Sequence, residues 1–283
     1  MGVPNFIVAG TQKAATTWLH ECLNEHPEVF VPKVKEVHFF CKEPCRKSKN
    51  HLGTDWYISQ FPDNKSFKAI GEISVDYMYY EHIAEDIFNF NPNMKILFIL
   101  RNPVDRAYSA YWMNKRHKSN MPEFQEFIRV DHEIIDRGFY YNQIERYFEF
   151  FNKNIKIFFY EDLLKNPEAF IKDVYSFLNV DNGFIPQTLY YKVASTRELG
   201  PLIGKVLYKY VAPILKKSAL LSSLWRAVKF NTPAKRLFSV TKENTSKYKT
   251  INTNDRECLI EIYKKENIKL FDLIGRNIDE WDN

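Results

Sequence analysis

The sequence has no apolar run near the ~20 residues that a membrane-spanning helix needs, so we expect no transmembrane segment. It has only nine glycines, no Gly/Ser-rich linker and no internal repeat. The first expected strand begins at about residue 5, which leaves no room for a signal peptide before it. We therefore predict a soluble, cytoplasmic protein in which residues 1–283 form one domain.

Cysteines are also few. Cys22, Cys41, Cys45 and Cys258 contain no CxxC pair, and the Cys41–Cys45 spacing has no matching second half for a zinc site. We therefore expect free thiols in a reducing compartment and no metal. The formal net charge of +5 is modest, and no recognised nucleic-acid-binding motif accompanies it, so nucleic acid is not an expected partner.

The most informative stretch is residues 6–19, which read FIVAGTQKAATTWL. An apolar run of strand length ends at Gly10, a small-residue loop carries Lys13, and paired threonines open an amphipathic segment, which predicts strand, loop and helix. Such a loop can hold an anion, because the positive end of the helix lies behind it and Lys13 adds a full charge. The backbone N–H groups expected to face the anion are those of Ala14, Ala15 and Thr16.

This loop differs from the nucleoside triphosphatase pattern GxxxxGK[ST]. Lys13 comes only three residues after Gly10, and two alanines separate it from the next hydroxyl. A later strand, 96–100, ends in Arg101-Asn102-Pro103, where an ATPase would usually place a metal-binding aspartate. Neither half of a magnesium site is present, so a kinase or ATPase is disfavoured. We expect a phosphate compound held by fixed positive charge.

The two motifs resemble those of the sulfotransferases that use 3′-phosphoadenosine 5′-phosphosulfate (PAPS). KAATT at residues 13–17 is similar to their 5′-phosphosulfate loop KxGT[ST], with Ala15 in place of the glycine. Arg101-Asn102-Pro103 with Ser109 is similar to their 3′-phosphate motif. The resemblance implies PAPS as co-substrate, bound at its 3′-phosphate by Arg101 and Ser109. It implies a 5′-phosphosulfate site formed by Gln12, Lys13, Ala14, Ala15, Thr16 and Thr17.

The segment KEVHFF at residues 35–40 resembles the heparan sulfate branch of this family. That resemblance implies that Glu36 is the general base, and we expect partial desolvation to raise its pKa. His38 is either the base itself or an orienting partner, because in an extended segment both side chains would point to the same face. Lys13 is the expected stabiliser of the leaving group.

Four further residues are weaker candidates. Arg197 occupies the place of a basic family loop that closes over the 3′-phosphate. Glu72 either orients Lys13 or contacts the acceptor, with simple ion pairing as the alternative. Tyr140 and Gln143 resemble an element of bacterial members, either near the acceptor or in helix packing.

Apolar runs alternate with amphipathic segments along the chain, which predicts an α/β fold with a P-loop-like parallel sheet of about four or five strands. Helices flank the sheet, extra helices follow at the C-terminus, and ligands bind where the strands end. The expected strands are 6–10, 29–31, 69–74, 95–100 and 155–159.

Residues 199–250 form a basic, mostly helical insertion that interrupts this alternation. Between residues 201 and 249, Glu243 is the only acid among many lysines and arginines. The insertion is either a lid over the acceptor, a surface for an acidic glycan, or a peripheral contact with an anionic membrane.

These features predict transfer of a sulfuryl group from PAPS to a hydroxyl, or less readily an amine, without a metal and with release of 3′-phosphoadenosine 5′-phosphate (PAP). A noncatalytic nucleotide- or glycan-binding protein of the same fold is the alternative. The KEVHFF resemblance favours a carbohydrate acceptor. An alkaloid, polyketide or lipid alcohol is favoured by Ile73, which stands where the heparan sulfate enzymes have an acceptor-binding lysine. The sequence gives no indication of oligomeric state.

Overall fold

The structure of the chain is a computed structural model that describes residues 2–33, 35–45, 47–63, 66–117, 120–190 and 250–281. Residues 1–193 and 251–283 belong to one compact unit. The predicted insertion at 199–250 lies outside the described residues, apart from Thr250, and so does Arg197. The predicted lid and phosphate-closing loop therefore stay predictions.

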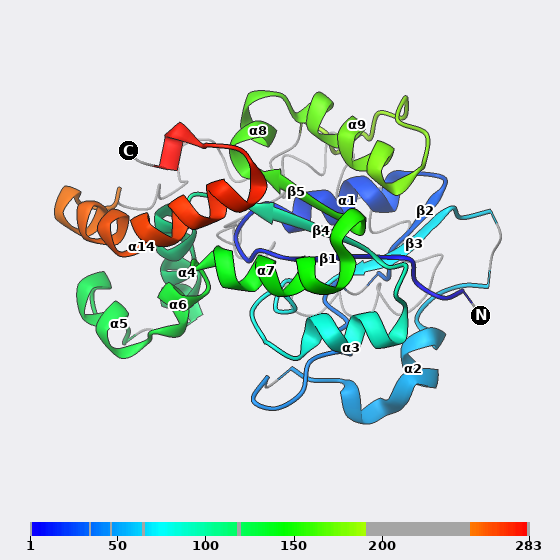
Figure 1. Cartoon of the computed structure of the whole chain (residues 1–283), viewed down its shortest axis with the longest axis horizontal. Helices are drawn as coiled ribbons and strands as arrows, with labels where there is room; N and C mark the ends of the chain where they lie inside the picture. Colours follow the sequence, from blue (N-terminus) through cyan, green and yellow to red (C-terminus); the bar gives the residue numbers. More distant parts are fainter. Residues whose placement is uncertain are drawn as a thin grey trace, which may run out of the picture. The chain divides into compact units, whose positions relative to one another are not determined.

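Five parallel strands form one sheet in the order β2-β3-β1-β4-β5, which confirms the predicted α/β architecture (Figure 1). The strands have almost the bounds that their apolar runs predicted, because each run is closed by a polar residue, glycine or proline. They are β1 (Phe6–Gly10), β2 (Val29–Phe30), β3 (Ala69–Ile73), β4 (Lys95–Leu100) and β5 (Ile155–Phe159).

Helices cover both faces of this sheet (Figure 1). One face is covered by α1 (Thr16–Glu25), α8 (Tyr160–Lys165) and α9 (Pro167–Leu178). The other carries α2 (Gly53–Ser59), α3 (Ile83–Phe90), α7 (Tyr140–Phe151) and the C-terminal part of α14 (Thr253–Ile274). The remaining described helices are α4 (Pro103–His117), α5 (Phe124–Val130), α6 (Glu133–Asp136) and the 3-10 turns η1 (Asn50–Leu52), η2 (Asn152–Asn154) and η4 (Asp279–Trp281).

The hydrophobic core has two layers because successive strand side chains point to opposite faces. In β4, Ile96 and Phe98 pack with α3 and α7, whereas Leu97 and Ile99 pack with α1 and α9. All four side chains are fully buried. A continuous apolar strand is thus the expected signature of a parallel sheet covered on both sides.

The strand order indicates where this sheet is expected to bind a ligand. From the central strand β1 the chain builds β2 and β3 on one side of the sheet and then crosses to β4 and β5 on the other. The carboxyl ends of β1 and β4 therefore flank the point where the order reverses, which is where open α/β sheets bind ligands. Within the described residues, no helix combines the length and apolar character needed to cross a lipid bilayer.

Candidate functional site

The loop between β1 and α1 has the backbone geometry of an anion cradle. Lys13 and Ala15 have left-handed φ angles of 73° and 60°, a conformation that favours glycine. Helix α1 has no acidic residue in its first turn, and Ala15 at its N-cap makes no side-chain hydrogen bond. The positive end of the helix is therefore open to an anion. Gly10 must be small, because a Cβ there would lie 2.7 Å from Met78 Sδ.

Arg101, the first residue after β4, joins the second predicted phosphate motif to this loop. Its Nη1 donates a hydrogen bond to the main-chain oxygen of Lys13 at 3.0 Å. Its guanidinium also lies 4.7 Å from the centre of the Tyr160 ring, just after β5. Because Nε of Arg101 is buried without a hydrogen-bond partner within the described structure, the guanidinium keeps donors for an incoming anion.

Asn102 fixes the start of α4, which carries Ser109. The Asn102 Oδ1 accepts the backbone N–H of Val104 at 2.9 Å, and its own N–H donates to Glu161 Oε1 at 2.8 Å. Ser109 lies two helical turns after Arg101 and is half-buried. The structure thus places Arg101 and Ser109 on one connected strand-to-helix unit beside the Lys13 loop.

Tyr140 and Gln143 have the contacts of the helix-packing alternative. Tyr140 is 1% exposed, its hydroxyl donates to the Arg101 main-chain oxygen at 2.8 Å, and its ring packs against Trp281. Burial raises its pKa. Gln143 donates to the main-chain oxygens of Asp136 and Phe139. Tyr140 therefore holds the backbone of Arg101 in place. Its contacts do not favour the alternative that it binds the acceptor.

Glu36 and His38 meet in the loop after β2, but this segment is not extended as predicted. Both residues have left-handed φ angles, 69° and 58°. The conformation is held by the end of β3 and the residue after it, since Glu36 N donates to the Ile73 oxygen at 3.0 Å and His38 N to Ser74 Oγ at 3.3 Å. As a result, His38 Nε2 lies 3.3 Å from Glu36 Oε2. Non-glycine residues held in this region cluster at functional sites.

The predicted direction of the Glu36 pKa is wrong. Burial by itself raises this pKa, as expected, but the hydrogen bond with His38 and the charges of Lys35 and Lys47 outweigh it. The net pKa lies well below the usual range, so Glu36 is ionised at neutral pH. Lys35 Nζ lies 2.8 Å from Oε1, and Lys47 Nζ lies 3.8 Å from Oε2.

Asp76 and Arg137 belong to the same cluster, and the sequence analysis missed both. Asp76 Oδ2 lies 3.7 Å from His38 Nδ1, and Asp76 Oδ1 lies 2.9 Å from Nη1 of Arg137. Arg137 also pairs with Glu133 at 2.8 Å and lies over the Tyr79 ring. The position of Asp76, three residues beyond the end of β3, is the signal that could have identified it.

Glu72 is buried within β3 and surrounded by hydroxyl groups. Tyr57 and Tyr77 donate to its Oε1 at 2.8 and 3.0 Å, and Ser74 donates to its Oε2 at 2.5 Å. Burial raises its pKa, although these hydrogen bonds and the charge of His38 oppose the shift. At 1% exposure, Glu72 supports the loop that carries Glu36 and His38, because Ser74 is hydrogen-bonded both to Glu72 and to the backbone N–H of His38.

The fold and site together define an α/β protein with a loop suited to an anion at the edge of its parallel sheet. The family described as sulfotransferase domain matches residues 4–196, well over half of the chain. The chain therefore belongs to the sulfotransferase domain family. The match covers every predicted site residue except Arg197.

Individual relatives share only part of their length with this chain. The chain is 33% identical over 168 residues to the membrane-associated sulfotransferase kil1 of Dictyostelium discoideum, covering 55% of this chain and 33% of that protein. It is 30% identical over 200 residues to the human bifunctional heparan sulfate N-deacetylase/N-sulfotransferase 3, covering 63% of this chain and 22% of that protein. It is 26% identical over 203 residues to the mouse heparan sulfate glucosamine 3-O-sulfotransferase 5, covering 67% of this chain and 57% of that protein.

A solved structure supports the fold. The crystal structure of a sulfotransferase from Alicyclobacillus acidocaldarius superposes with a TM-score of 0.72, covering all of both chains, at 24% sequence identity. This likeness confirms the fold, and the roles of individual residues are argued from the geometry of this chain.

Proposed function

We propose that this protein transfers a sulfuryl group from PAPS to a hydroxyl, or less readily an amine, and releases PAP. The observation that carries the proposal is the hydrogen bond from Arg101 Nη1 to the Lys13 oxygen at 3.0 Å. It brings together two motifs that lie far apart in the sequence and that resemble the 5′- and 3′-phosphate sites of one nucleotide. Ser109, on the helix that follows Arg101, is the further donor for the 3′-phosphate.

In this proposal the loop residues Gln12 to Thr17 hold the 5′-phosphosulfate. Their backbone N–H groups and the positive end of α1 face the anion, and the Lys13 ammonium follows the bridging oxygen as negative charge develops. Sulfuryl transfer is expected to be in line and loose, by analogy with phosphoryl transfer, so positioning and charge neutralisation supply most of the catalysis. A divalent ion has no assigned part in this step.

Glu36 is the proposed base, with His38 as its orienting partner. The Glu36 side chain is 24% exposed, whereas that of His38 is 6% exposed, so an acceptor reaches the carboxylate first. Both imidazole nitrogens of His38 also face protein groups, Nε2 towards Glu36 and Nδ1 towards Asp76 and Cys41. The lowered pKa makes the Glu36 carboxylate a weaker base. The acceptor hydroxyl becomes strongly acidic as the new S–O bond forms, so its proton can pass to the ionised carboxylate at that stage.

A carbohydrate is the preferred acceptor class, because two of the relatives above are named as heparan sulfate sulfotransferases. A small natural product is the second candidate. Ile73 at the end of β3 is fully apolar where the resemblance calls for a lysine, which lowers the positive charge available to an acidic glycan.

The proposal is tested by calorimetry with PAP followed by a transfer assay. We expect PAP to bind, and labelled PAPS to donate to at least one member of a panel of glycans and small metabolites, without added magnesium. No heat with PAP, together with tight binding of ATP and magnesium, would reject the assignment. PAP binding without transfer to any acceptor, unchanged by Glu36→Gln, would favour the noncatalytic alternative.

A further inference from the structure

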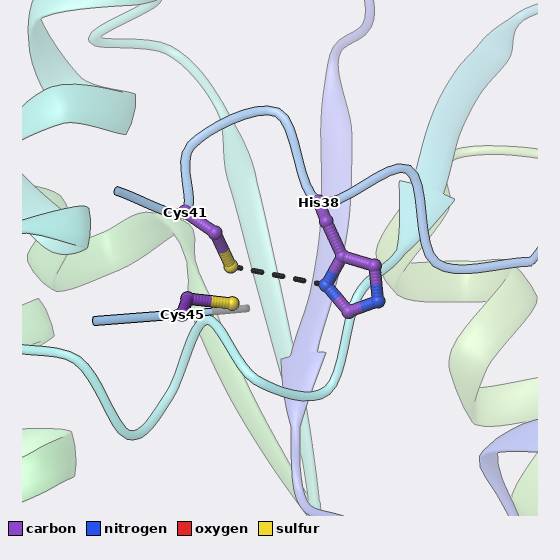
Figure 2. Close-up of side chains that lie close together, drawn as sticks. All are labelled: His38, Cys41 and Cys45. Carbon is purple, nitrogen blue, oxygen red and sulfur yellow. Dashed lines mark hydrogen bonds between the residues drawn. The ribbon is translucent and has the colours of Figure 1, made fainter. Parts of the chain in front are cut away.

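We propose that His38, Cys41 and Cys45 form a binding site for a zinc ion. The three side chains converge from one loop (Figure 2). Their donor atoms all lie within 4.8 Å of one another, and Cys41 Sγ is 3.8 Å from His38 Nδ1. Ligand atoms around a tetrahedral zinc, with Zn–S near 2.3 Å and Zn–N near 2.1 Å, are separated by roughly 3.5 to 3.8 Å.

The donor set suits zinc rather than magnesium or calcium. Two sulfurs and an imidazole nitrogen are borderline-soft ligands that favour zinc, whereas the hard cations prefer oxygen. Two thiolates would also neutralise the charge of the ion, which matters because His38, Cys41 and Cys45 are at most 5% exposed. The sequence did not predict this site, because it contains no CxxC pair and the turn that brings His38 to Cys41 and Cys45 is not visible in their spacing.

The surroundings also fit a metal on Nδ1 of His38. Ligating histidines usually donate their other N–H to a carboxylate, and His38 Nε2 lies 3.3 Å from Glu36 Oε2. Asp76 Oδ2 lies 3.7 Å from the same Nδ1 and is a candidate fourth ligand. Water is the other candidate for that position. The cobalt spectrum of Asp76→Asn distinguishes the two, because it should change only if the Asp76 carboxylate is a ligand.

The loop that carries these residues has reason to need a crosslink. Between the end of β2 at Phe30 and the start of η1 at Asn50, its described residues contain no helix or strand. Long segments without secondary structure are uncommon in compact domains unless they are functional. A zinc ion would join His38 to Cys41 and Cys45. It would thereby hold Glu36 and His38 in their left-handed backbone conformation. The ion is structural in this proposal and takes no part in the sulfuryl transfer.

Two other states use the same atoms. The Cys41 thiol can donate a hydrogen bond to His38 Nδ1, or the two cysteines can form a disulfide under oxidising conditions. Neither would give a cobalt–thiolate spectrum in the reduced protein. Cobalt(II) is therefore a suitable probe, because it occupies zinc sites and its absorption reports thiolate ligands and tetrahedral geometry.

The experiment titrates cobalt(II) into full-length protein that has been treated with a chelator and kept reduced with a phosphine. We expect a thiolate-to-cobalt charge-transfer band that saturates at one equivalent and disappears when zinc is added. Cys41→Ser and Cys45→Ser should each remove about half of the band intensity. His38→Ala should weaken zinc binding by more than the ~100-fold that loss of an outer hydrogen-bond partner costs.

Cys258→Ser is the matched control, because Cys258 is an exposed free thiol outside the cluster. It should leave the band unchanged, and zinc should raise the melting temperature of this variant but not of the Cys41→Ser/Cys45→Ser double variant. Absence of the band in folded, reduced wild type would overturn the proposal, as would a band that survives in the double variant. The titration contains no nucleotide, so its failure is separate from a failure of PAP binding.

Discussion

Asp76 Oδ1 lies 2.9 Å from Nη1 of Arg137, and both side chains are almost fully buried, at 6% and 9% exposure. This ion pair fixes Asp76 so that its second oxygen faces His38 Nδ1 at 3.7 Å. Arg137, Asp76, His38 and Glu36 thus form one connected row of charged and polar groups. Arg137 and Asp76 position His38 and Glu36, and Glu36 has the most exposed side chain of the four, at 24%.

We predict that Asp76→Asn lowers kcat about 10- to 100-fold while PAP affinity stays within about twofold, because His38 loses the group that orients it. Removing one partner of a buried ion pair also costs stability, about 3 to 5 kcal/mol. A melting curve must therefore show that the variant is folded at the assay temperature. Asp76→Glu should recover part of kcat. If kcat and PAP affinity fall together, Asp76 has only a structural role.

Arg101 is predicted to determine nucleotide affinity. Arg101→Ala removes the guanidinium that we assign to the 3′-phosphate, and the Kd for PAP should rise about 10- to 100-fold, equivalent to about 1.4 to 2.8 kcal/mol. Calorimetry measures this directly. Lys172→Ala is a suitable control because Lys172 pairs with Glu168 on the surface. An adenosine nucleotide without the 3′-phosphate should lose less affinity than PAP in Arg101→Ala, because it loses only the support that Arg101 gives to the Lys13 loop. An equal loss for the two nucleotides would contradict the assignment.

Lys13 is predicted to act mainly on turnover. In Lys13→Ala the main-chain oxygen that accepts from Arg101 remains, so the loop keeps its contact with the second motif. The lost ammonium should lower kcat about 100- to 1,000-fold, whereas the Kd for PAP should change less than about tenfold. Steady-state kinetics at saturating PAPS and calorimetry give the two numbers. Unchanged kcat with weaker binding would make Lys13 a ground-state phosphate ligand only.

Glu36→Gln and His38→Ala together identify the base. If Glu36 accepts the proton, the glutamine variant should lose about 100- to 10,000-fold in kcat at saturating PAPS, and the histidine variant less. Both should still bind PAP, which serves as the check on folding. If Glu36→Gln keeps the wild-type kcat while His38→Ala reduces it, Glu36 is not the base and the assignment moves towards His38.

The parts of the site that follow from local sequence were predictable, and those that depend on contacts between distant residues were not. Lys13 and Arg101 follow the apolar runs of β1 and β4, so a strand end located each of them. The left-handed backbone at Glu36 and His38 was not predictable, because it is imposed by Ile73 and Ser74 of a different strand segment.

The ion pair of Arg137 and Asp76 was not predictable either, because it also joins residues that lie far apart in the sequence. Arg137 follows the four-residue helix α6, which has too few turns to give a periodic pattern, and its partner Asp76 follows β3. No local spacing links the two residues. The lowered pKa of Glu36 was mispredicted for a related reason. Desolvation was visible in its apolar neighbours Val37 and Phe39, but the hydrogen bond with His38 depends on the turn that the backbone makes.

Glu72 gives a prediction for stability against pH. Burial raises its folded-state pKa above the ordinary value of about 4.3. When pH rises above that value, the unfolded chain loses this proton first, so the unfolded state binds fewer protons and the folded state becomes relatively less stable. The loss continues until pH passes the folded pKa. Glu72→Gln keeps an acceptor for Tyr57 and Tyr77 but cannot ionise.

We therefore expect the melting temperature of wild type minus that of Glu72→Gln to be greatest near pH 4 and to decrease as pH rises towards neutrality. Melting curves at matched ionic strength measure the difference. Glu168→Gln is the control with the opposite sign, because the hydrogen bond and charge of Lys172 lower the pKa of Glu168. The melting temperature of Glu168→Gln should be slightly lower than that of wild type at neutral pH, and this difference should shrink as pH falls. A wild-type advantage over Glu72→Gln that grows with pH would show that the three hydroxyl donors outweigh burial and that Glu72 is held as a carboxylate.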